Sequence, residues 1–242
     1  HGRIDAVTVL PTDPSALQAS VADAAAVLAD GGLVVLPTDT VYGIAADAFD
    51  ADAVAALLAA KGRGRAMPPP VLVASVAMLD VLGVDISEAA RALAQAFWPG
   101  ALTLVVNAQP SLQWDLGETA GTVALRMPDE ATAIALLEST GPLAVSSANR
   151  TGMPAATSVG EAKGQLGARV ARYLDGGPSK GGQASTIVDA TSATLTILRE
   201  GAISREELAA IVPHLAGDVQ DAAEATEDSD APGTQAPDGA AG

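Results

Sequence analysis

The sequence predicts a single α/β domain built on a mixed β-sheet. Hydrophobic residues make up 49% of the 242 residues, which is enough to cover a core of that size. Short apolar runs typical of buried strands, such as 33–36 and 143–146, alternate with segments of helical spacing, such as 16–29. The two kinds of segment interleave without a repeat of fixed length, which favours one mixed sheet over a regular barrel.

Capping residues and apolar spacing predict the helices. Asp13 and Pro14 are suited to the start of the first helix, and Asp50 is suited to cap the second. Gly31 is expected to stop the first helix before the first buried strand. The predicted helices span residues 16–29, 50–60, 76–82, 87–97, 131–139, 159–166 and 205–212.

Apolar and β-branched runs predict the strands. Pro37 ends the first run, because proline cannot donate a hydrogen bond to a neighbouring strand. The run 101–107 contains the pair Val105 and Val106, and the run 122–127 alternates between apolar and polar residues. The predicted strands span residues 33–36, 71–74, 101–107, 122–127, 143–146, 170–174, 186–189 and 195–198.

Composition changes sharply at the C-terminus. Residues 218–242 hold seven of the 29 acidic side chains and none of the 13 basic ones. This composition predicts a disordered, solvated tail rather than a docking peptide. The expected organisation is therefore an N-terminal arm at 1–14, in which His1 in place of Met suggests a cloning remnant, a folded α/β domain at 15–215 and an acidic tail at 216–242.

Several function classes are disfavoured by composition. The chain has no Cys, which excludes disulfides, thiolate metal sites and cysteine nucleophiles. Of the two histidines, His214 falls at the end of the chain's last predicted helix, which argues against a Ser-His-Asp triad. The net charge of −16 and the scarcity of aromatic residues argue against nonspecific or stacking-based nucleic-acid binding. No apolar run approaches the length of a membrane span, so we expect a cytoplasmic protein with no membrane contact.

A polar loop follows the first buried strand. Thr38, Asp39, Thr40 and Tyr42 bring three hydroxyls and a carboxylate into five residues, and Gly43 frees the backbone for a tight return. Loops held by a rigid strand are where binding groups concentrate, so we expect this loop to form part of a binding site. Tyr42 has an alternative role as a buried core residue whose hydroxyl is satisfied by the protein.

Three of the 13 basic residues, Lys61, Arg63 and Arg65, lie within five positions of an acidic chain. Glycines between them allow a ligand to approach the backbone, and Lys and Arg are suited to phosphate oxygens. The equally weighted alternative is a solvated helix end, where cations are favoured by the helix dipole. No Walker A or G-x-G-x-x-G pattern occurs, so a nucleotide would be held in another way.

Other polar groups follow or interrupt predicted strands. Ser147 and Asn149 come directly after a buried strand, where they would suit a ligand or, equally, a helix cap or Asx-turn. Arg126 stands in an apolar strand, so we expect its side chain to face the polar side of the sheet or a cleft, or to pair with a structural partner such as Asp129. Arg199, which follows a predicted strand, is likewise expected either to face a cleft or to pair with a structural partner.

Seven segments, in this order and at similar spacing, resemble the YrdC-like threonylcarbamoyl-AMP synthases of tRNA modification. The segments are Pro37–Gly43 (PTDTVYG), Lys61–Arg63 (KGR), Phe97–Thr103 (FWPGALT), Val123–Pro128 (VALRMP), Ser147–Asn149 (SAN), Ser185–Asp189 (STIVD) and Leu198–Ile203 (LREGAI).

The resemblance implies an open, twisted α/β fold with a concave groove. It also implies a nucleotidyltransferase that joins L-threonine, bicarbonate and ATP, with Mg²⁺ on the phosphates and no metal site made by the protein alone. The product would pass to a tRNA-modifying threonylcarbamoyl-transferase complex, with at most weak contact between this protein and tRNA. By similarity, the catalytic residues would be Lys61 and Arg63, the ATP-binding residues Lys61, Arg63, Ser147, Asn149 and Arg199, and the threonine-binding residues Thr38, Tyr42, Arg126 and Ser185. Asp39 would be structural.

The chain departs from the family pattern at two places. Many relatives have proline after the arginine of Lys-x-Arg, where this chain has Gly64 followed by Arg65. Longer relatives add a C-terminal domain, so any lid function would have to come from another segment, such as 176–182. Two alternative functions are a non-catalytic RNA-binding module that binds tRNA in the groove, and a related carbamoyl-transfer enzyme with another acceptor.

Overall fold

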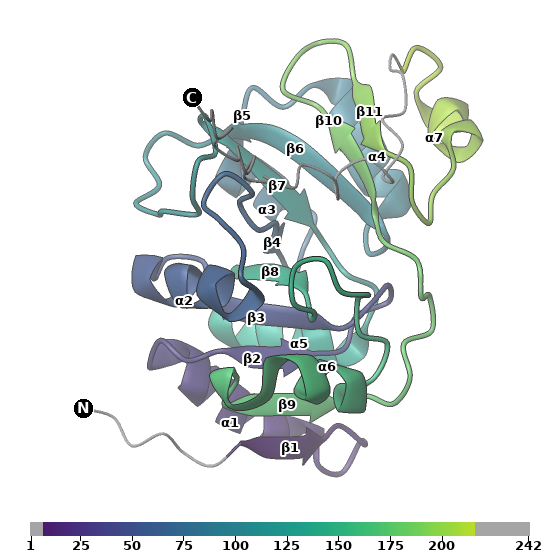
Figure 1. Ribbon diagram of the computed structural model, residues 1–242. Coiled ribbons are helices and arrows are strands. Elements are labelled where there is room, and N and C mark those ends of the chain that lie inside the picture. The colour runs from purple at the N-terminus through teal and green to yellow at the C-terminus, as the bar shows by residue number, and fades with distance from the viewer. Residues whose placement is uncertain (1–6, 216–242) are drawn as a thin grey trace, which may run out of the picture.

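The computed structural model describes residues 7–215 (Figure 1). The first six residues of the expected N-terminal arm and the expected acidic tail at 216–242 lie outside the described residues. Within the described part, no helix combines the length and the apolar character that a membrane span requires.

Eleven strands of the described chain form one mixed sheet. The order across the sheet is β1-β9-β2-β3-β8-β4-β7-β6-β10-β11, and β5 pairs with β6 outside this path. Four neighbouring pairs are parallel, namely β1–β9, β9–β2, β4–β7 and β6–β10, and the others are antiparallel. The strands are β1 Thr8–Pro11, β2 Val34–Leu36, β3 Gly43–Asp47, β4 Val71–Leu72, β5 Gly83–Val84, β6 Leu102–Ala108, β7 Thr122–Arg126, β8 Leu143–Ser147, β9 Arg172–Asp175, β10 Thr186–Asp189 and β11 Thr196–Arg199.

The α/β fold with a mixed sheet is confirmed, and every predicted helix is present. The helices are α1 Leu17–Ala29, α2 Ala51–Lys61, α3 Met78–Leu82, α4 Glu88–Phe97, α5 Ala131–Thr140, α6 Val159–Leu166 and α7 Arg205–Ile211, with a 3₁₀ turn at Gly167–Arg169. Asp50 caps α2 as predicted, because its Oδ1 accepts from the amides of Asp52 and Ala53 at 3.0 Å each. Asp13 does not cap α1, which begins at Leu17; its carboxylate instead accepts from Ser15 in the preceding turn.

Three strands were not predicted from the sequence. The stretch Gly43–Asp47 is rich in Gly and Ala, which have low strand propensity, yet it forms β3 because β2 and β8 pair with it on both sides. β1 lies within the expected arm at 1–14 and pairs with β9 at the edge of the sheet. β5 contains two residues and leaves no periodic signal.

Helices cover the two halves of the sheet differently. Around β2, β3 and β9, helices α1 and α5 pack on one face, and α2 and α6 pack on the other. Around β6, β7, β10 and β11, helices α3, α4 and α7 share a single hydrophobic core on one face. In β6, Leu102, Leu104 and Val106 enter that core, so Thr103 and Val105 point to the opposite face. That face carries no helix and forms the floor of the cavity described below.

The side chain of Thr186 connects β10 to the turn after β11. Its fully buried hydroxyl donates to Ile203 O (2.6 Å) and accepts from the amides of Gly201 (2.9 Å) and Ile203 (3.0 Å). We expect Thr186→Val to lower the free energy of unfolding by roughly 2–4 kcal/mol, because it leaves buried backbone groups without a partner. Thr186→Ser keeps the hydroxyl and serves as the control in denaturant unfolding. Equal losses in the two variants would contradict a role for the hydroxyl.

Candidate functional site

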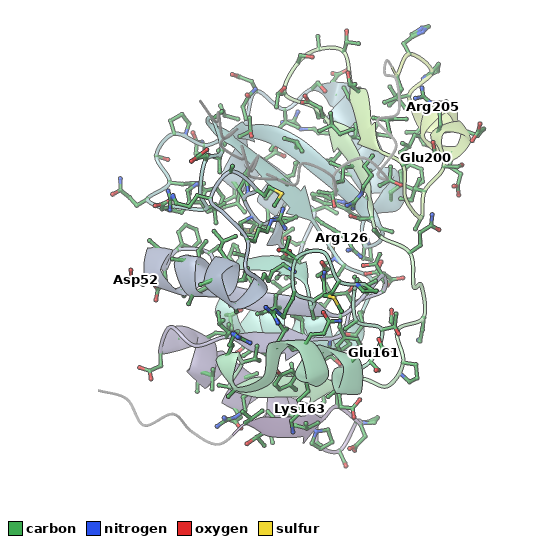
Figure 2. All side chains as sticks on the ribbon, in the orientation of Figure 1. Asp52, Arg126, Glu161, Lys163, Glu200 and Arg205 are labelled. Carbon is green, nitrogen blue, oxygen red and sulfur yellow. The ribbon has the colours of Figure 1, made fainter. Side chains whose placement is uncertain are left out.

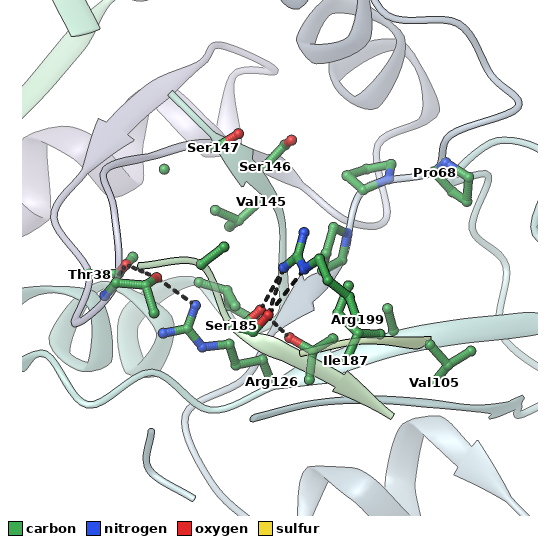
Figure 3. A pocket seen from close by; sticks show the side chains of 18 of the residues that line it. Thr38, Pro68, Val105, Arg126, Val145, Ser146, Ser147, Ser185, Ile187 and Arg199 are labelled. Atoms are coloured by element: carbon green, nitrogen blue, oxygen red, sulfur yellow. Dashed lines mark hydrogen bonds between the residues drawn. The ribbon is translucent and has the colours of Figure 1, made fainter. Parts of the chain in front are cut away.

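A cavity of about 450 Å³ lies on the open face of the sheet, between its two halves (Figure 3). Its floor comes from β6, β7 and β10, one wall from the polar loop 38–42, and another from the three prolines 68–70. The end of β8 closes it opposite the floor. Its polar lining consists of Thr38, Thr40, Tyr42, Arg63, Thr103, Thr119, Thr122, Arg126, Ser146, Ser147, Ser185 and Arg199. A volume of this size suits a nucleotide-sized ligand.

A directed chain of hydrogen bonds shapes the polar loop. Arg126 Nη1 donates to Thr40 Oγ1 at 2.9 Å, and the Thr40 and Thr38 hydroxyls are 3.0 Å apart. Thr38 Oγ1 donates to Val41 O (2.6 Å) and accepts from Thr40 N (3.2 Å). Because the Thr38 proton goes to Val41, the Thr40 hydroxyl is the donor between the two threonines. Arg126 therefore fixes the loop that forms one wall of the cavity.

Arg126 is buried, with 7% of its surface exposed, and lies in the middle of the molecule (Figure 2). Its Nη2 donates to Asp39 Oδ1 at 2.5 Å, and its Nε donates to Gly100 O at 2.9 Å. Asp129, the partner considered from the sequence, instead donates its amide to Asp39 Oδ1 at 3.0 Å. Burial lowers the pKa of Arg126, and the adjacent Asp39 carboxylate opposes that shift. The contacts of Asp39 are thus structural, as expected.

Lys61 and Asn149 are neighbours, but neither lines the cavity. Lys61 is 3% exposed, and its ammonium group donates to the carbonyl oxygens of Ser147 and Asn149, the latter at 2.8 Å, and to Asn149 Oδ1 at 3.3 Å. These three acceptors match the three donors of a lysine. Burial, followed by the charge of Arg63, lowers the pKa of Lys61 to about 8. Gly62 ends α2 in the left-handed conformation, with φ +67°, so Lys61 is the last residue of the helix, but its burial differs from the solvated helix end considered from the sequence.

Arg63 and Arg199 carry unpaired charge into the cavity. Arg63 Nη1 donates to Ser146 Oγ at 3.0 Å, while its buried Nε has no partner in residues 7–215. Arg199 donates to Ser185 O at 2.7 Å, and the Ser185 hydroxyl lies 2.9 Å from that of Thr103. Within the described chain, no carboxylate forms a salt bridge with either arginine. Burial lowers the pKa of both guanidinium groups, a cost that a bound anion would offset.

Arg65 does not join the other two cations of its cluster. Its Nη2 donates to both carboxylate oxygens of Asp115, at 2.8 and 3.1 Å, outside the cavity. Of the three cations that the sequence places together, only Arg63 lines the cavity. The left-handed conformation of Gly62 turns the chain at the end of α2. The residues after Gly62 therefore run in a different direction from Lys61.

The Tyr42 hydroxyl is satisfied by the protein, which is the alternative raised from the sequence. It donates to Gly177 O at 2.6 Å and accepts from Gly176 N at 3.1 Å, and burial raises the pKa of Tyr42 to about 12. Ser179 and Gly182 also donate to Thr40 O, the latter at 2.9 Å. Segment 176–182 therefore packs on the polar loop, and a lid function for it stays a prediction.

Five polar residues that line the cavity were not assigned as site residues from the sequence: Thr40, Thr103, Thr119, Thr122 and Ser146. Thr40 and Ser146 lie beside residues that were named, so position alone could have found them. Thr103 is 1% exposed and alternates with core residues of β6. Its role depends on Ser185, which is distant in the sequence, so no local signal identifies it.

The comparisons with known proteins agree on one family. A model of the Sua5/YciO/YrdC family, described as "Telomere recombination", matches residues 26–201. A Mycobacterium leprae protein provisionally named threonylcarbamoyl-AMP synthase is 56% identical over 200 residues, which cover 83% of this chain and 91% of that protein. The threonylcarbamoyl-AMP synthase of Bacillus subtilis is 39% identical over 195 residues, covering 79% of this chain and 56% of the relative.

A solved structure shares the fold. The crystal structure of Pyrococcus abyssi Sua5 complexed with L-threonine matches with a TM-score of 0.83 at 33% identity. The match covers 88% of this chain but 63% of that one, so this chain spans less than two thirds of the solved relative.

The buried ammonium of Lys61 predicts a pH-dependent stability. Its folded pKa of about 8 lies below the ordinary value of 10.5, so between these values the unfolded chain binds a proton that the folded chain has released. Stability from this group should therefore rise with pH across that window, by at most about 1.4 kcal/mol per pH unit. We expect the difference in unfolding free energy between the wild type and Lys61→Met to grow from pH 8 to pH 10 in urea titrations. A difference that is flat or falls with pH would contradict the lowered pKa.

Proposed function

Because the chain belongs to the Sua5/YciO/YrdC family, we propose that it synthesises L-threonylcarbamoyl-AMP and pyrophosphate from L-threonine, bicarbonate and ATP. The observation that carries the proposal is the pair of cavity arginines, Arg63 and Arg199, whose charges lack a carboxylate partner in residues 7–215. Such a pair suits a polyanionic substrate. The transfer of an adenylyl group makes the enzyme a nucleotidyltransferase.

The reaction requires alignment more than acid–base chemistry. The threonine amine attacks the carbon of bicarbonate, and loss of water leaves a carbamate. A carbamate oxygen then bonds to the α-phosphorus of ATP as the bond to the pyrophosphate oxygen breaks. The protein's part is to hold two anions in line and to offset the charge that builds up on the phosphate oxygens. Arginines are suited to this, because they stay charged even where burial lowers their pKa.

We assign Arg63, Ser147 and Arg199 to the ATP phosphates. Arg63, which donates to Ser146 of β8, and Ser147 line the cavity on one side, and Arg199 lines it from β11 beside Ser185. Lys61 and Asn149 support this site, because the Lys61 ammonium is bonded to the turn that carries Ser147 and Asn149. Their contribution to catalysis is to keep Ser147 in place beside Arg63.

We assign the threonine site to the part of the cavity beside the polar loop. Arg126 has two N–H groups left after its three protein contacts, which suits a carboxylate, and Ser185 offers a hydroxyl. Thr38 and Tyr42 form the wall, since both hydroxyls are already bonded to the protein. The L-threonine complex of Pyrococcus abyssi Sua5 supports an amino-acid site in this fold.

We propose that Mg²⁺ would enter with ATP and would neutralise part of the charge of its phosphates. Among residues 7–215, no three His, Cys, Asp or Glu side chains are grouped so that they could hold a metal ion. The protein's own residues would therefore meet the ion through the nucleotide.

The proposed function links this domain to a later step that uses its product. Residues 15–215 would act as the catalytic domain, with β1 added at its edge. The mixed anhydride product would pass to a threonylcarbamoyl-transferase complex that modifies the adenosine beside the anticodon. We propose a cytoplasmic location, because the product would be used on tRNA.

The test of the proposed function is threonine-dependent release of pyrophosphate. We expect the protein, mixed with ATP, Mg²⁺ and bicarbonate, to release pyrophosphate only when L-threonine is added, with AMP-linked product detected by mass spectrometry. Serine and valine serve as control amino acids. Release at the same rate without threonine would refute the substrate assignment, and salt-dependent RNA binding with no turnover would favour an RNA-binding module instead.

The role of Arg63 gives a second test. Replacing it with Ala removes a charge-assisted contact, so we expect ATP binding to weaken by roughly 1.5–3 kcal/mol in calorimetric titrations. Ser146→Ala, which removes only the protein partner of Arg63, is the matched control and should cost less. An unchanged ATP affinity in Arg63→Ala would assign this residue to the helix end alone.

A further inference from the structure

The loop between β6 and β7, residues 109–121, extends from one half of the sheet to the segment that follows α2. It starts at the end of β6, and it lies directly above α2 in Figure 1. Leu116 and Thr119 of this loop line the cavity beside the three prolines 68–70. Two separate parts of the chain therefore share one wall of the candidate site.

Two side-chain contacts hold the loop in this position. Trp114 stacks on Phe49, from the turn before α2, with ring centroids 5.5 Å apart and an angle of 25° between the rings. Its neighbour Asp115 accepts both hydrogen bonds from Arg65, at 2.8 and 3.1 Å. We call these two contacts, Phe49–Trp114 and Arg65–Asp115, the clasp.

The backbone of the loop is shaped around Arg65. The amide of Glu118 donates to Arg65 O at 2.9 Å, and the amide of Gly117 donates to Asp115 Oδ1 at 3.0 Å. Gly117 adopts a φ of +112°, and a Cβ at this position would lie 2.6 Å from Arg65 O. Only glycine allows this approach without a shift of the backbone. The loop backbone thus packs closely on Arg65, and the ion pair adds a side-chain contact to this packing.

We propose that the clasp positions the nucleotide site, by holding the segment that carries Arg63 and the proline wall against the 109–121 loop. The inference rests on the proposed function, because it takes ATP to be the ligand of the cavity. None of the four clasp side chains lines the cavity, so they act through Arg63, Leu116 and the prolines. Arg65 and Asp115 are therefore positioning residues.

Because the clasp lies outside the cavity, we expect it to affect ATP affinity more than turnover. The side chains of Arg65 and Asp115 are 55% and 45% exposed, so the pair is individually weak and sensitive to salt. Its loss leaves the reacting groups in place but allows the walls to separate, which weakens ATP binding before it affects turnover. A residue needed only for folding would not separate the two quantities.

The experiment measures ATP affinity and turnover in Arg65→Ala, Asp115→Ala and the double variant. The matched control is Arg91→Ala, which breaks the Arg91–Asp80 pair, of 42% and 55% exposure, on α3 and α4. We expect Kd for ATP with Mg²⁺ to rise about three- to fivefold in each clasp variant, with kcat within about twofold of the wild type. The double variant should be no worse than either single one, and the swap Arg65→Asp with Asp115→Arg should restore part of the affinity.

Trp114 provides a readout that does not depend on activity. The chain has two tryptophans, and the other, Trp98, is buried at 5% exposure. We expect acrylamide to quench the fluorescence of Arg65→Ala and Asp115→Ala more than that of the wild type and of Arg91→Ala, because Trp114 moves away from Phe49.

The outcomes separate the two proposals. Clasp variants that match Arg91→Ala in both ATP affinity and quenching would overturn the clasp. Increased quenching together with unchanged ATP affinity would also overturn its role in positioning. A wild-type protein that binds no ATP would overturn the proposed function, and the quenching comparison would still decide whether the ion pair holds Trp114 in place.

Discussion

The buried ion pair between Arg126 and Asp39 is the contact on which the arrangement of the cavity depends. Arg126 comes from β7, and Asp39 comes from the loop between β2 and β3, so the pair joins the two halves of the sheet. The same arginine fixes Thr40 and the carbonyl of Gly100. Removal of either partner would leave an uncompensated charge in the interior, which is strongly destabilising. The halves are thereby held at a defined distance, and the cavity is the space between them.

The uneven distribution of helices explains why the cavity lies on one face only. Helices cover both faces of the half that contains β2, β3 and β9, but one face of the half that contains β6, β7 and β10. On the open face, the hydroxyls of Thr103 and Ser185 are hydrogen-bonded to each other, and Ser185 also accepts from Arg199. These bonds allow polar groups to be buried without a ligand, whereas Arg63 Nε has no such partner among residues 7–215.

The three basic residues at the end of α2 have different roles. Lys61 is directed at the turn after β8, Arg63 at the cavity, and Arg65 at the loop between β6 and β7. The left-handed conformation of Gly62 ends the helix and turns the following residues away from Lys61. One short segment therefore connects three separate parts of the chain around the cavity. Its positive charge is used partly for structure and partly for binding.

The sequence by itself determined the α/β class, the seven helices of the described chain and the segments that meet at the cavity, because these depend on local periodicity, caps and motif order. It could not determine that Gly43–Asp47 is a strand, since the pairing of β3 with β2 and β8 outweighs its weak propensity. Nor could it assign Arg126 to Asp39 rather than Asp129, or separate Arg65 from Arg63. Those choices depend on contacts between residues distant in the chain, and only the packed tertiary structure brings these residues together.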